Sequence, residues 1–316
     1  MNVRRATPDD YEAVVDLTDG IWADRGGDYI PDVYHEWLEA EDETEKKTFL
    51  AEIDGDAAGI VQAVLLSPDE AWFQGIRVAP KYRRQGVSHR LNEACFEWAR
   101  DRGATVGRVM IFSWNAASLG AARASGFEPI TEFRFAHPEP DPDADGPETH
   151  EVSADSAAAW RYWTHCDART HLSGLGLAPE ALWAMRELTR TDFEEFADET
   201  AVFAVHSDDG LAGAAYRTQT FERSVTAADG DVEDSTESTK SMRTETWAEY
   251  GVGAWDDVES AQALFAAISR DAASLGVDGT RVLIPETARD VSDAAAVGVS
   301  VADEPDFVLG IVLTER

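Results

Sequence analysis

A basic turn between an expected strand and an expected helix is the segment of this sequence best suited to chemistry. The chain has 27 Lys and Arg against 61 Asp and Glu, a net charge of −34, yet four of its bases crowd one turn: Lys81, Arg83, Arg84 and Arg90. Gly86 stands among them, where a residue without a Cβ can take a positive φ. A helix that begins near Ser88 would point its free N–H groups at this turn. The pattern predicts a phosphate site; the alternative is a solvated basic turn that caps a helix.

The elements expected around the turn form one mixed α/β unit over residues 1–137. Alternating apolar residues predict strands at 3–7, 47–54, 57–67, 71–79, 106–112 and 127–136. Apolar residues at helical spacing predict helices at 7–18, 31–38, 88–102 and 115–125. The last strand is expected to close the sheet. The strand that ends at Ala79 and the helix that follows would hold the basic turn between them.

The second half repeats this order of elements more faintly. Expected helices and strands there are a helix at 156–165, a helix at 179–188, a hairpin across 208–210, a strand at 245–255, a helix at 258–275, a strand at 281–286, a helix at 288–299 and a strand at 307–314. We therefore expect a duplicated fold with domains at 1–137 and 151–316. The acidic, proline-rich segment 138–150 between them predicts a linker or an exposed loop, and residues 229–240 predict a solvated loop.

The second copy lacks a comparable basic turn. At that point of the repeat the sequence reads Asp256-Asp257-Val258-Glu259. Acids at the start of a helix stabilise its dipole but repel a diphosphate. We therefore expect this degenerate copy to bind no phosphate ligand and to support the first copy.

Charge and composition exclude several classes of partner. A net charge of −34 repels phosphodiester backbones and anionic lipids, so we expect neither nucleic acid nor a membrane as partner. No run approaches the ~18 apolar residues of a membrane span, and the first residues show no apolar signal segment, which predicts a cytoplasmic protein. The two cysteines, Cys95 and Cys166, stand far apart, so we expect neither a disulfide framework nor a metal site. A monomer and a homodimer both remain open.

The composition also resembles that of proteins from salt-in halophilic archaea. Asp and Glu are abundant, and only four lysines occur, at positions 46, 47, 81 and 240. Multimolar salt would screen the repulsion between so many acids, since the Debye length then falls to about 3 Å. The alternative is an acidic protein from a mesophile.

Two motifs of the first half resemble the GNAT superfamily of acetyl-CoA-dependent N-acetyltransferases. Arg83-x-x-Gly86-x-Ser88 is similar to the family's Arg/Gln-x-x-Gly-x-Gly/Ala signature, with Ser88 as the one departure. Asn115-Ala-Ala-Ser, followed by Gly126-Phe127, is similar to its later helix and strand. The resemblance covers residues 1–136 and implies a GNAT fold with acetyl-CoA as cosubstrate and without a metal. It implies these cofactor-binding residues: Ile76 and Val78 beside the pantetheine, Arg83, Arg84, Gln85, Gly86, Val87 and Ser88 around the diphosphate, and Asn115 on the far arm.

A shorter resemblance concerns the acceptor. Residues 28–37 and 75–80 look like segments of the histidine N-acetyltransferase group, which also carries a degenerate second half. This implies a small amine acceptor, such as a free amino acid, and makes Asp28, Tyr29 and Tyr34 candidate substrate-binding residues. Two alternatives stay open. The aromatic residues could be core residues under a connecting loop, and Asp28 could merely cap the following helix.

The proton route is the least defined part of the expected site. Amide formation from a thioester needs a neutral amine, an aligned carbonyl and a proton for the thiolate. Many GNAT enzymes carry a glutamate base and a tyrosine acid at the positions that are Gln74 and Ala122 here, and neither residue exchanges a proton. The carbonyl of Gln74 could hold an amine or a water, and His35 titrates near neutrality when unperturbed. Gln74 and His35 are therefore the catalytic candidates, with Glu36 beside them, although both helix residues could equally be plain surface residues.

Three functions follow from these observations. The leading hypothesis is an enzyme that transfers acetyl from acetyl-CoA to a primary amine of a small molecule by direct attack in a ternary complex. The second is an acetyltransferase that acts on protein N-termini or lysines. The third is a non-catalytic acyl-CoA-binding module, which the presence of Gln74 and Ala122 would suit.

Overall fold

The computed structural model describes residues 1–23, 27–39, 45–226 and 242–314. The chain forms two compact units. Unit 1 comprises Met1–Ile130, Glu180–Arg186 and Asp306–Arg316; unit 2 comprises Thr131–Pro179 and Glu187–Pro305. The expected α/β class is confirmed, but the expected division at 1–137 and 151–316 differs from these units, because two later segments of the chain belong to unit 1. The expected loop at 229–240 lies outside the described residues.

Unit 1 is built on a mixed sheet. Its strands, in spatial order, are β1 (Asn2–Arg5), β2 (Lys46–Ile53), β3 (Asp56–Leu65), β4 (Glu70–Val78), β5 (Val106–Phe112), β15 (Asp306–Val312) and the start of β6 (Glu128–His137). The pairing of β4 with β5 is parallel, whereas the pairs β1–β2, β2–β3, β3–β4 and β5–β15 are antiparallel. The strands expected in the first half therefore lie within a few residues of their predicted positions.

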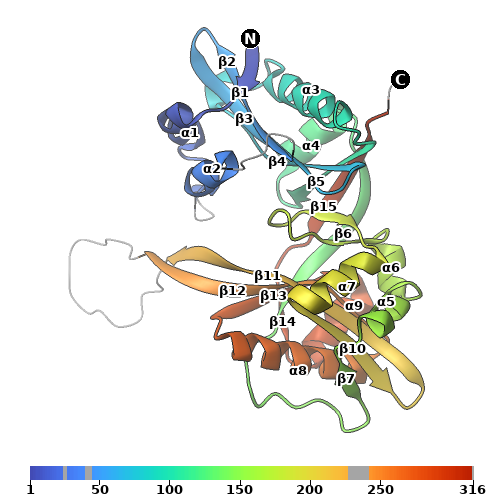
Figure 1. The fold of residues 1–316 in the computed structure, drawn as a ribbon. Helices are drawn as coiled ribbons and strands as arrows, with labels where there is room; N and C mark the ends of the chain where they lie inside the picture. The colour runs from blue at the N-terminus through green and yellow to red at the C-terminus, as the bar shows by residue number, and fades with distance from the viewer. Residues whose placement is uncertain (24–26, 40–44, 227–241, 315–316) are drawn as a thin grey trace, which may run out of the picture. The chain divides into compact units, whose positions relative to one another are not determined.

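Helices cover both faces of this sheet, as Figure 1 shows. On one face lie η1 (Pro8–Asp10), α1 (Tyr11–Thr18) and α2 (Ile30–Leu38); on the other lie α3 (Val87–Arg100), preceded by η3 (Pro80–Tyr82), and α4 (Ala116–Ala124). Alternate strand residues point to opposite faces, so Leu50 and Ile60 join the α1–α2 core while Val61 and Phe73 join the α3–α4 core. Side chains in register with Ile60 therefore face α2.

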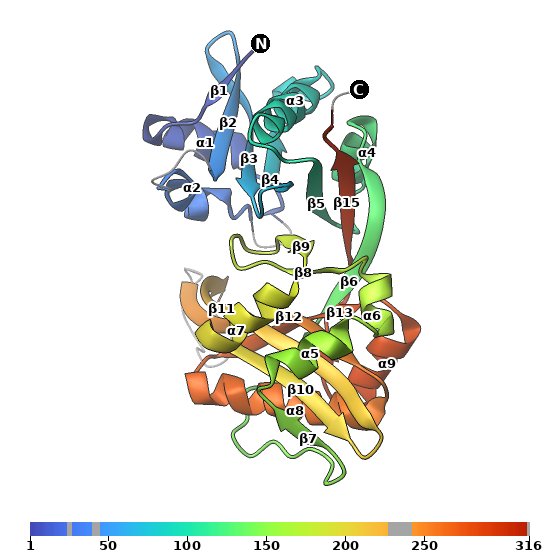
Figure 2. The ribbon, with the colours of Figure 1, turned by 45° about the vertical axis from the view of Figure 1, so that its right-hand side comes forward.

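The element order of unit 2 resembles that of unit 1, but α6 and β8 have no counterpart there. Its strands are β7 (Glu151–Ser153), β8 (Leu175–Leu177), β10 (Ala201–Ser207), β11 (Gly210–Thr226), β12 (Met242–Trp255), β13 (Gly279–Pro285) and β14 (Ser300–Val301). Its helices are α5 (Ser156–Trp163), α6 (Asp167–His171), α7 (Arg190–Glu199), α8 (Val258–Leu275) and α9 (Ala288–Ala296). Figure 2 shows α5 and α7 over β10 and β11. Tyr216 stacks on Phe196 of α7, whereas its neighbour Ala215 packs with α8, so the two helix layers cover opposite faces.

Each unit contains a strand, or part of one, that comes from the other half of the sequence. In unit 1 the C-terminal strand β15 pairs along β5, from Asp306 opposite Phe112 to Val312 opposite Val106. In unit 2 the later residues of β6, Phe133–Ala136, pair with β13, and the end of β6 also pairs with β14. Residues 127–136, which were expected to close the first sheet, form β6, the last strand of unit 1 in spatial order, and β15 lies between β5 and β6.

Two expectations for the second half have different outcomes. Residues 138–150 form an irregular and largely exposed segment, which fits the exposed-loop alternative. Asp141 N–H donates to the Ser269 carbonyl (3.1 Å), and Arg270 donates to the Ala144 carbonyl, so this loop is tied to α8. Residues 179–188 form no helix. Trp183 has a φ of +62°, and β9 (Met185–Glu187) follows.

The helix of this region starts later, at Arg190. Thr189 and Asp192 form a capping box at its start, in which Thr189 N–H donates to the Asp192 carboxylate (2.6 Å) and Asp192 N–H donates to the Thr189 hydroxyl (3.4 Å). Such reciprocal bonds satisfy two otherwise free backbone donors and fix the helix start.

No helix in the described ranges has the length and apolar character of a membrane span.

A chain that ends at Pro305 is predicted to lose the fold of unit 1. It removes every β15 partner of β5 together with Leu309 and Leu313, which are buried in the α3–α4 core. Each lost leucine costs roughly 2–5 kcal/mol, a large part of a typical stability of about 5–15 kcal/mol. Hydrogen exchange measured by mass spectrometry should show protection lost in β5. A chain that ends at Leu313 is the control, and unchanged protection of β5 in the shorter chain contradicts the prediction.

Candidate active site

The defining feature of unit 1 is a place where two neighbouring strands stop pairing. Among the described residues, β4 pairs with β5 over Glu70–Trp72, opposite Val106–Arg108. Both strands then continue without each other, β4 to Val78 and β5 to Phe112. We call this the strand fork: β4 beyond Trp72 and β5 beyond Arg108. An ion pair between Glu70 and Arg108, both nearly buried, holds its closed end. The fork leaves backbone edges of two parallel strands facing each other, which an extended ligand can occupy.

A β-bulge in β4 accompanies the fork. Ile60 stands opposite Arg77 and Gln62 opposite Gln74, so β4 uses one residue more than β3 over this stretch. The bulged stretch of β4 contains Gly75, whose φ is +64°. Glycine takes that conformation without strain. A Cβ at Gly75 would lie 2.2 Å from Cη2 of Trp37. The ring of Trp37 therefore excludes any larger residue from the bulge, and the bulge bends β4 away from the line of β5.

The predicted basic turn lies directly after β4. Gly86 is the N-cap residue of α3, with φ +79°, and among the described residues no side chain caps this helix. The first N–H groups of an α-helix have no acceptor inside the helix, so those of Val87, Ser88 and His89 point out of its start. A Cβ on Gly86 would meet no protein atom within 4 Å. The glycine is therefore required by the backbone conformation and not by crowding from the protein.

Two of the four bases in the turn are already paired with acids. Lys81 pairs with Asp56 (2.6 Å) and Arg90 with Glu93 (2.9 Å). Arg83 donates to the carbonyl of Val78 (3.4 Å), and Arg83 and Arg84 have exposed side chains without an acidic partner in the described part of the chain. Arg84 itself has a φ of +61°. The positive charge available to an anion in this turn is therefore that of Arg83 and Arg84.

The remaining cofactor candidates lie on the two arms of the fork. Ile76 and Val78 are on β4 beyond Trp72, and their carbonyls accept from the guanidinium groups of Arg77 (3.1 Å) and Arg83 (3.4 Å). Asn115 follows β5 and is the N-cap of α4, where its Oδ1 accepts from Ser118 N–H (3.1 Å). The structure thus brings Ile76, Val78, the basic turn and Asn115 to the open end of one fork.

Gln74 stands on β4 two residues beyond the last pair with β5. Its Nε2 donates to Oε1 of Gln62 (2.6 Å), and Nε2 of Gln62 donates to the Trp37 carbonyl (3.2 Å) and to Oγ1 of Thr48 (3.1 Å). Gln62 and Thr48 are buried, whereas Gln74 is partly exposed. One end of the Gln74 amide is therefore anchored in the core, and the residue reaches the fork from the α2 face of the sheet.

Two predicted site residues lie away from Gln74. Tyr34 is fully buried in the α1–α2 core, and its hydroxyl donates to the Thr7 carbonyl (2.6 Å). It fills the core and has no surface for a substrate. His35 is exposed and stacks on Tyr11, with ring centroids 4.7 Å apart. It lies two residues from Trp37, roughly 200° around α2, so the helix turns His35 away from the sheet. Tyr34 therefore fits the alternative of a core residue, and His35 fits the alternative of a plain surface residue.

Asp28 and Tyr29 surround a buried arginine. Both Asp28 oxygens contact Arg77, at 2.5 Å from Nε and 3.2 Å from Nη2, and Oδ1 also accepts from Ile30 N–H at the start of α2. The carboxylate is 2% exposed, which fits the helix-capping alternative and not an ammonium site. The Arg77 guanidinium lies over the rings of Trp22 (4.0 Å) and Tyr29 (5.5 Å). Burial raises the pKa of Tyr29, so its phenol keeps its proton at neutral pH.

An aromatic cluster at the end of β5 was not predicted from the sequence. Its members, each in ring contact with at least one other, are Trp22, Tyr29, Trp37, Phe112, Trp114 and Trp183. Trp183 comes from residues 180–186, the segment of the second half that belongs to unit 1; its ring lies 5.9 Å from Tyr29 and 6.0 Å from Phe112. The abundance of tryptophan was a signal, but nothing local tied Trp183 to the first half.

The corresponding position of unit 2 has a different character. The helix that matches α3 in element order is α8, and its N-cap residue Asp257 accepts from Ser260 N–H (2.8 Å) and from the Ser260 hydroxyl (2.7 Å). The start of α8 is therefore already capped by a carboxylate, whereas the start of α3 in unit 1 has no side-chain cap. No group of three or more His, Cys, Asp or Glu side chains in the described ranges is placed to hold a metal ion.

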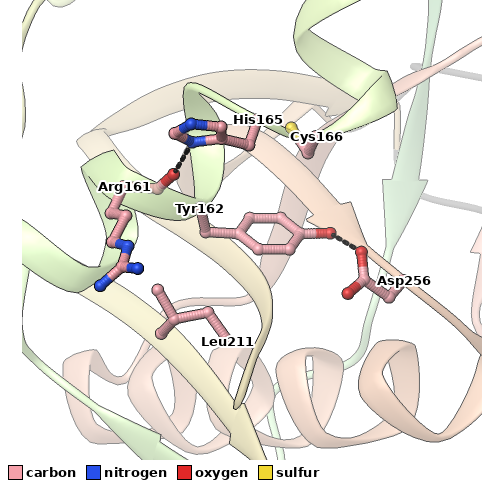
Figure 3. A pocket seen from close by; sticks show the side chains of 6 residues that line it. All are labelled: Arg161, Tyr162, His165, Cys166, Leu211 and Asp256. Carbon is pink, nitrogen blue, oxygen red and sulfur yellow. Dashed lines mark hydrogen bonds between the residues drawn. The ribbon is translucent and has the colours of Figure 1, made fainter. Parts of the chain in front are cut away.

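A surface pocket of about 290 Å³ also lies in unit 2. Figure 3 shows its lining: Arg161, Tyr162, His165, Cys166, Leu211 and Asp256. The Tyr162 hydroxyl donates to Asp256 (2.8 Å), and the His165 ring contacts the Arg161 carbonyl (2.9 Å). Burial raises the pKa of Cys166 to about 11. Its thiol is therefore protonated at neutral pH, which makes Cys166 a poor nucleophile.

Comparisons with known proteins agree with this geometry. A family model described as the acetyltransferase (GNAT) family matches residues 11–127. The histidine N-acetyltransferase of Xenopus tropicalis is 31% identical over 98 residues, which are 31% of this chain and 29% of that protein. The aminoglycoside N(6')-acetyltransferase type 1 of Klebsiella aerogenes is 34% identical over 88 residues, 26% of this chain and 58% of that enzyme. The matches therefore span less than two thirds of the length of these relatives.

Two solved structures share the fold of nearly the whole chain. A GCN5-related N-acetyltransferase from Sphaerobacter thermophilus aligns over 99% of this chain and 96% of its own, with a TM-score of 0.62 at 15% identity. A putative acetyltransferase from Thermoplasma acidophilum aligns over 99% of this chain and 100% of its own, with a TM-score of 0.56 at 15% identity. At this identity the likeness establishes the fold alone. The family model by itself identifies residues 11–127 as the part of this chain that matches the acetyltransferase (GNAT) family.

Proposed function

We propose that this protein transfers the acetyl group of acetyl-CoA to a primary amine of a small molecule, in a ternary complex built on unit 1. The single observation that carries the proposal is the strand fork, which opens beside an uncapped helix start. The uncapped start of α3 suits a diphosphate. The unpaired edge of β4 beyond Trp72 suits an extended chain of amides such as pantetheine, because such a chain can pair like a strand.

Acetyl-CoA binding is assigned to the turn and the two arms of the fork. The N–H groups around Gly86, Val87 and Ser88 hold the diphosphate, with Gln85 in the same turn. Arg83 and Arg84 supply the charge. Ile76 and Val78 lie along the pantetheine, and Asn115 lies by its far arm. In this scheme unit 2 takes no coenzyme, since Asp257 already caps α8.

The reaction joins the amine nitrogen to the thioester carbonyl carbon. The amine attacks as a neutral nucleophile, a C–N bond forms, and the C–S bond breaks with its electron pair leaving on the thiolate. The proton lost by the amine passes to water, and the thiolate takes one from water. Gln74 is assigned to hold the amine, because a neutral amide orients a nucleophile without exchanging a proton. Alignment of two bound reactants can supply much of such a rate enhancement.

A small acceptor is supported by the relatives and by the aromatic cluster. The relatives are named for histidine and for aminoglycosides, which are small amines. The cluster of Trp22, Tyr29, Phe112, Trp114 and Trp183 offers partly exposed rings at the end of β5. The faces of aromatic rings attract cations such as an ammonium group. We assign the acceptor to this end of the fork.

The test of this function is a thiol-release assay with purified full-length chain in multimolar KCl. Amino acids, polyamines, aminoglycosides and peptides serve as acceptors at a fixed acetyl-CoA concentration. We expect turnover with one or more of the small amines. Turnover confined to peptides would identify a protein acetyltransferase, and tight acetyl-CoA binding without any turnover would identify a binding module; either result rejects the proposal.

Gly86→Glu is predicted to weaken acetyl-CoA binding at least tenfold. The new side chain strains a positive φ, by about 1 kcal/mol, and places a carboxylate where the diphosphate lies. Gly276→Glu is the matched control, because Gly276 also has a positive φ, +69°, with nothing within 4 Å of a Cβ. Calorimetric titration should show wild-type affinity for the control and a similar Tm for both variants. Equal affinity in the two variants would remove the basic turn from the site.

Trp183→Ala is predicted to raise the KM for the acceptor about three- to tenfold, with the Kd for acetyl-CoA unchanged. The change removes ring contacts worth roughly 0.5–1.5 kcal/mol. Trp160→Ala is the control, since Trp160 is a partly buried tryptophan of unit 2 that packs on Phe193 (5.7 Å). The measurement is the KM of both variants for the acceptor, from steady-state kinetics at varied acceptor concentration. A wild-type acceptor KM in Trp183→Ala would exclude this residue from the acceptor site.

A further inference from the structure

A chain of two side-chain amides links the fork to the core of unit 1. Gln62 and Gln74 stand directly opposite each other on β3 and β4, and the Gln74 Nε2 donates to the Gln62 Oε1 (2.6 Å). Gln62 is 1% exposed. Its Nε2 uses its two hydrogens on the Trp37 carbonyl (3.2 Å) and on Thr48 Oγ1 (3.1 Å).

The polarity of this chain is determined by one backbone atom. A primary amide has one donor end and one acceptor end, and a backbone carbonyl can only accept. The end of Gln62 that faces the Trp37 carbonyl must therefore be its NH₂ group. Oε1 of Gln62 then faces Gln74, so the end of Gln74 that faces Gln62 must also be NH₂. The carbonyl oxygen is consequently the other end of the Gln74 amide.

We propose that Gln62 is a positioning residue, which fixes the Gln74 amide with its carbonyl oxygen presented to the amine nucleophile. The inference rests on the proposed function and adds the reason for the orientation. An amine whose N–H donates to this oxygen keeps its lone pair free for attack. The opposite orientation would present an NH₂ group that competes for that lone pair. A neutral acceptor with one fixed polarity thus stands where related enzymes are expected to carry a base.

Trp37 contacts both the pair of amides, through Gln62, and the bulge of β4. Its ring packs against Gly75, next to Gln74, and its carbonyl sets the direction of Gln62. One residue of α2 thereby fixes both the path of β4 and the polarity of the amide chain. An unsatisfied buried amide costs roughly 1–3 kcal/mol, so the reversed chain, with two acceptors facing each other at Trp37, is strongly disfavoured.

The first test is a titration that needs no turnover. In Gln74→Glu the new carboxyl faces Oε1 of Gln62, which can accept a hydrogen bond but cannot donate one. Hydrogen bonding to the neutral form raises a carboxyl pKa, so the pKa of this carboxyl should lie well above about 4.3, the usual value for glutamate. In the double variant Gln62→Met with Gln74→Glu the acceptor is gone, and the pKa should fall. Carboxyl ¹³C NMR measures both. The same pKa in the two variants overturns the proposal.

The second test is kinetic. Gln62→Met should lower kcat about tenfold, equivalent to about 1.4 kcal/mol of barrier, with unchanged acetyl-CoA affinity and a cooperative melt. Thr48→Val removes one partner of Gln62 but leaves the Trp37 carbonyl, so its kcat should stay within about threefold of wild type. The kcat of Gln74→Glu, divided by the kcat of the wild-type protein at the same pH, should fall as pH rises. The reason is that the neutral carboxyl mimics the amide and the ionised carboxylate does not.

The outcomes separate the two proposals. A ratio that rises with pH would mean that the new carboxylate works as a base, and a wild-type kcat in Gln62→Met would mean that Gln74 needs no orientation; each overturns the positioning role. Absence of turnover in the wild-type protein would reject the proposed function instead, and the carboxyl titration would still decide the polarity of the amide chain.

Discussion

The rest of unit 1 depends on the early end of pairing between two parallel strands. β4 and β5 separate after Trp72 and Arg108, and the buried Glu70–Arg108 pair fixes the point at which they part. Breaking a buried ion pair by removing one partner is strongly destabilising, so the closed end of the fork is well defined. The bulge at Gly75 bends β4 beyond it. The basic turn and α3 follow immediately, which places a helix start beside the open strand edge.

The second half of the chain makes the fork possible. A central strand that lost its partner on one edge and had none on the other would leave many backbone groups unsatisfied. The C-terminal strand β15 pairs along the whole of β5, so that β5 remains a sheet strand while its other edge stays open beyond Arg108. The segment 180–186 adds Trp183 to the aromatic cluster of the same unit. Unit 1 is therefore assembled from three separate stretches of the sequence.

Local patterns predicted the part of the site that local chemistry determines. The strand before Ala79, the turn around Gly86 and the helix after it follow from apolar periodicity and one glycine, and the structure has them within a few residues. The role of Asp28 could not be predicted in this way. Its carboxylate is taken by Arg77, which lies 49 positions later. Tyr34 likewise carries a polar group that suits a binding site, but its hydroxyl is satisfied by the Thr7 carbonyl inside the core.

Contacts between residues far apart in the sequence explain the remaining differences. Residues 138–150 form a largely exposed loop, and the sequence could not show that Asp141 N–H and the Ala144 carbonyl would find partners on α8. Residues 179–188 have helical spacing, but Trp183 takes a left-handed conformation and packs in unit 1. Gln62 shows no motif at all. Its importance becomes visible only when the register of β3 and β4 sets it opposite Gln74.

A crystal structure of the full chain with acetyl-CoA tests the central claim most directly. We predict one coenzyme per chain, with diphosphate oxygens on the N–H groups that surround Gly86 and the pantetheine alongside β4 between Phe73 and Val78. A coenzyme seated at the start of α8, or a diphosphate held anywhere other than the turn before α3, would contradict it.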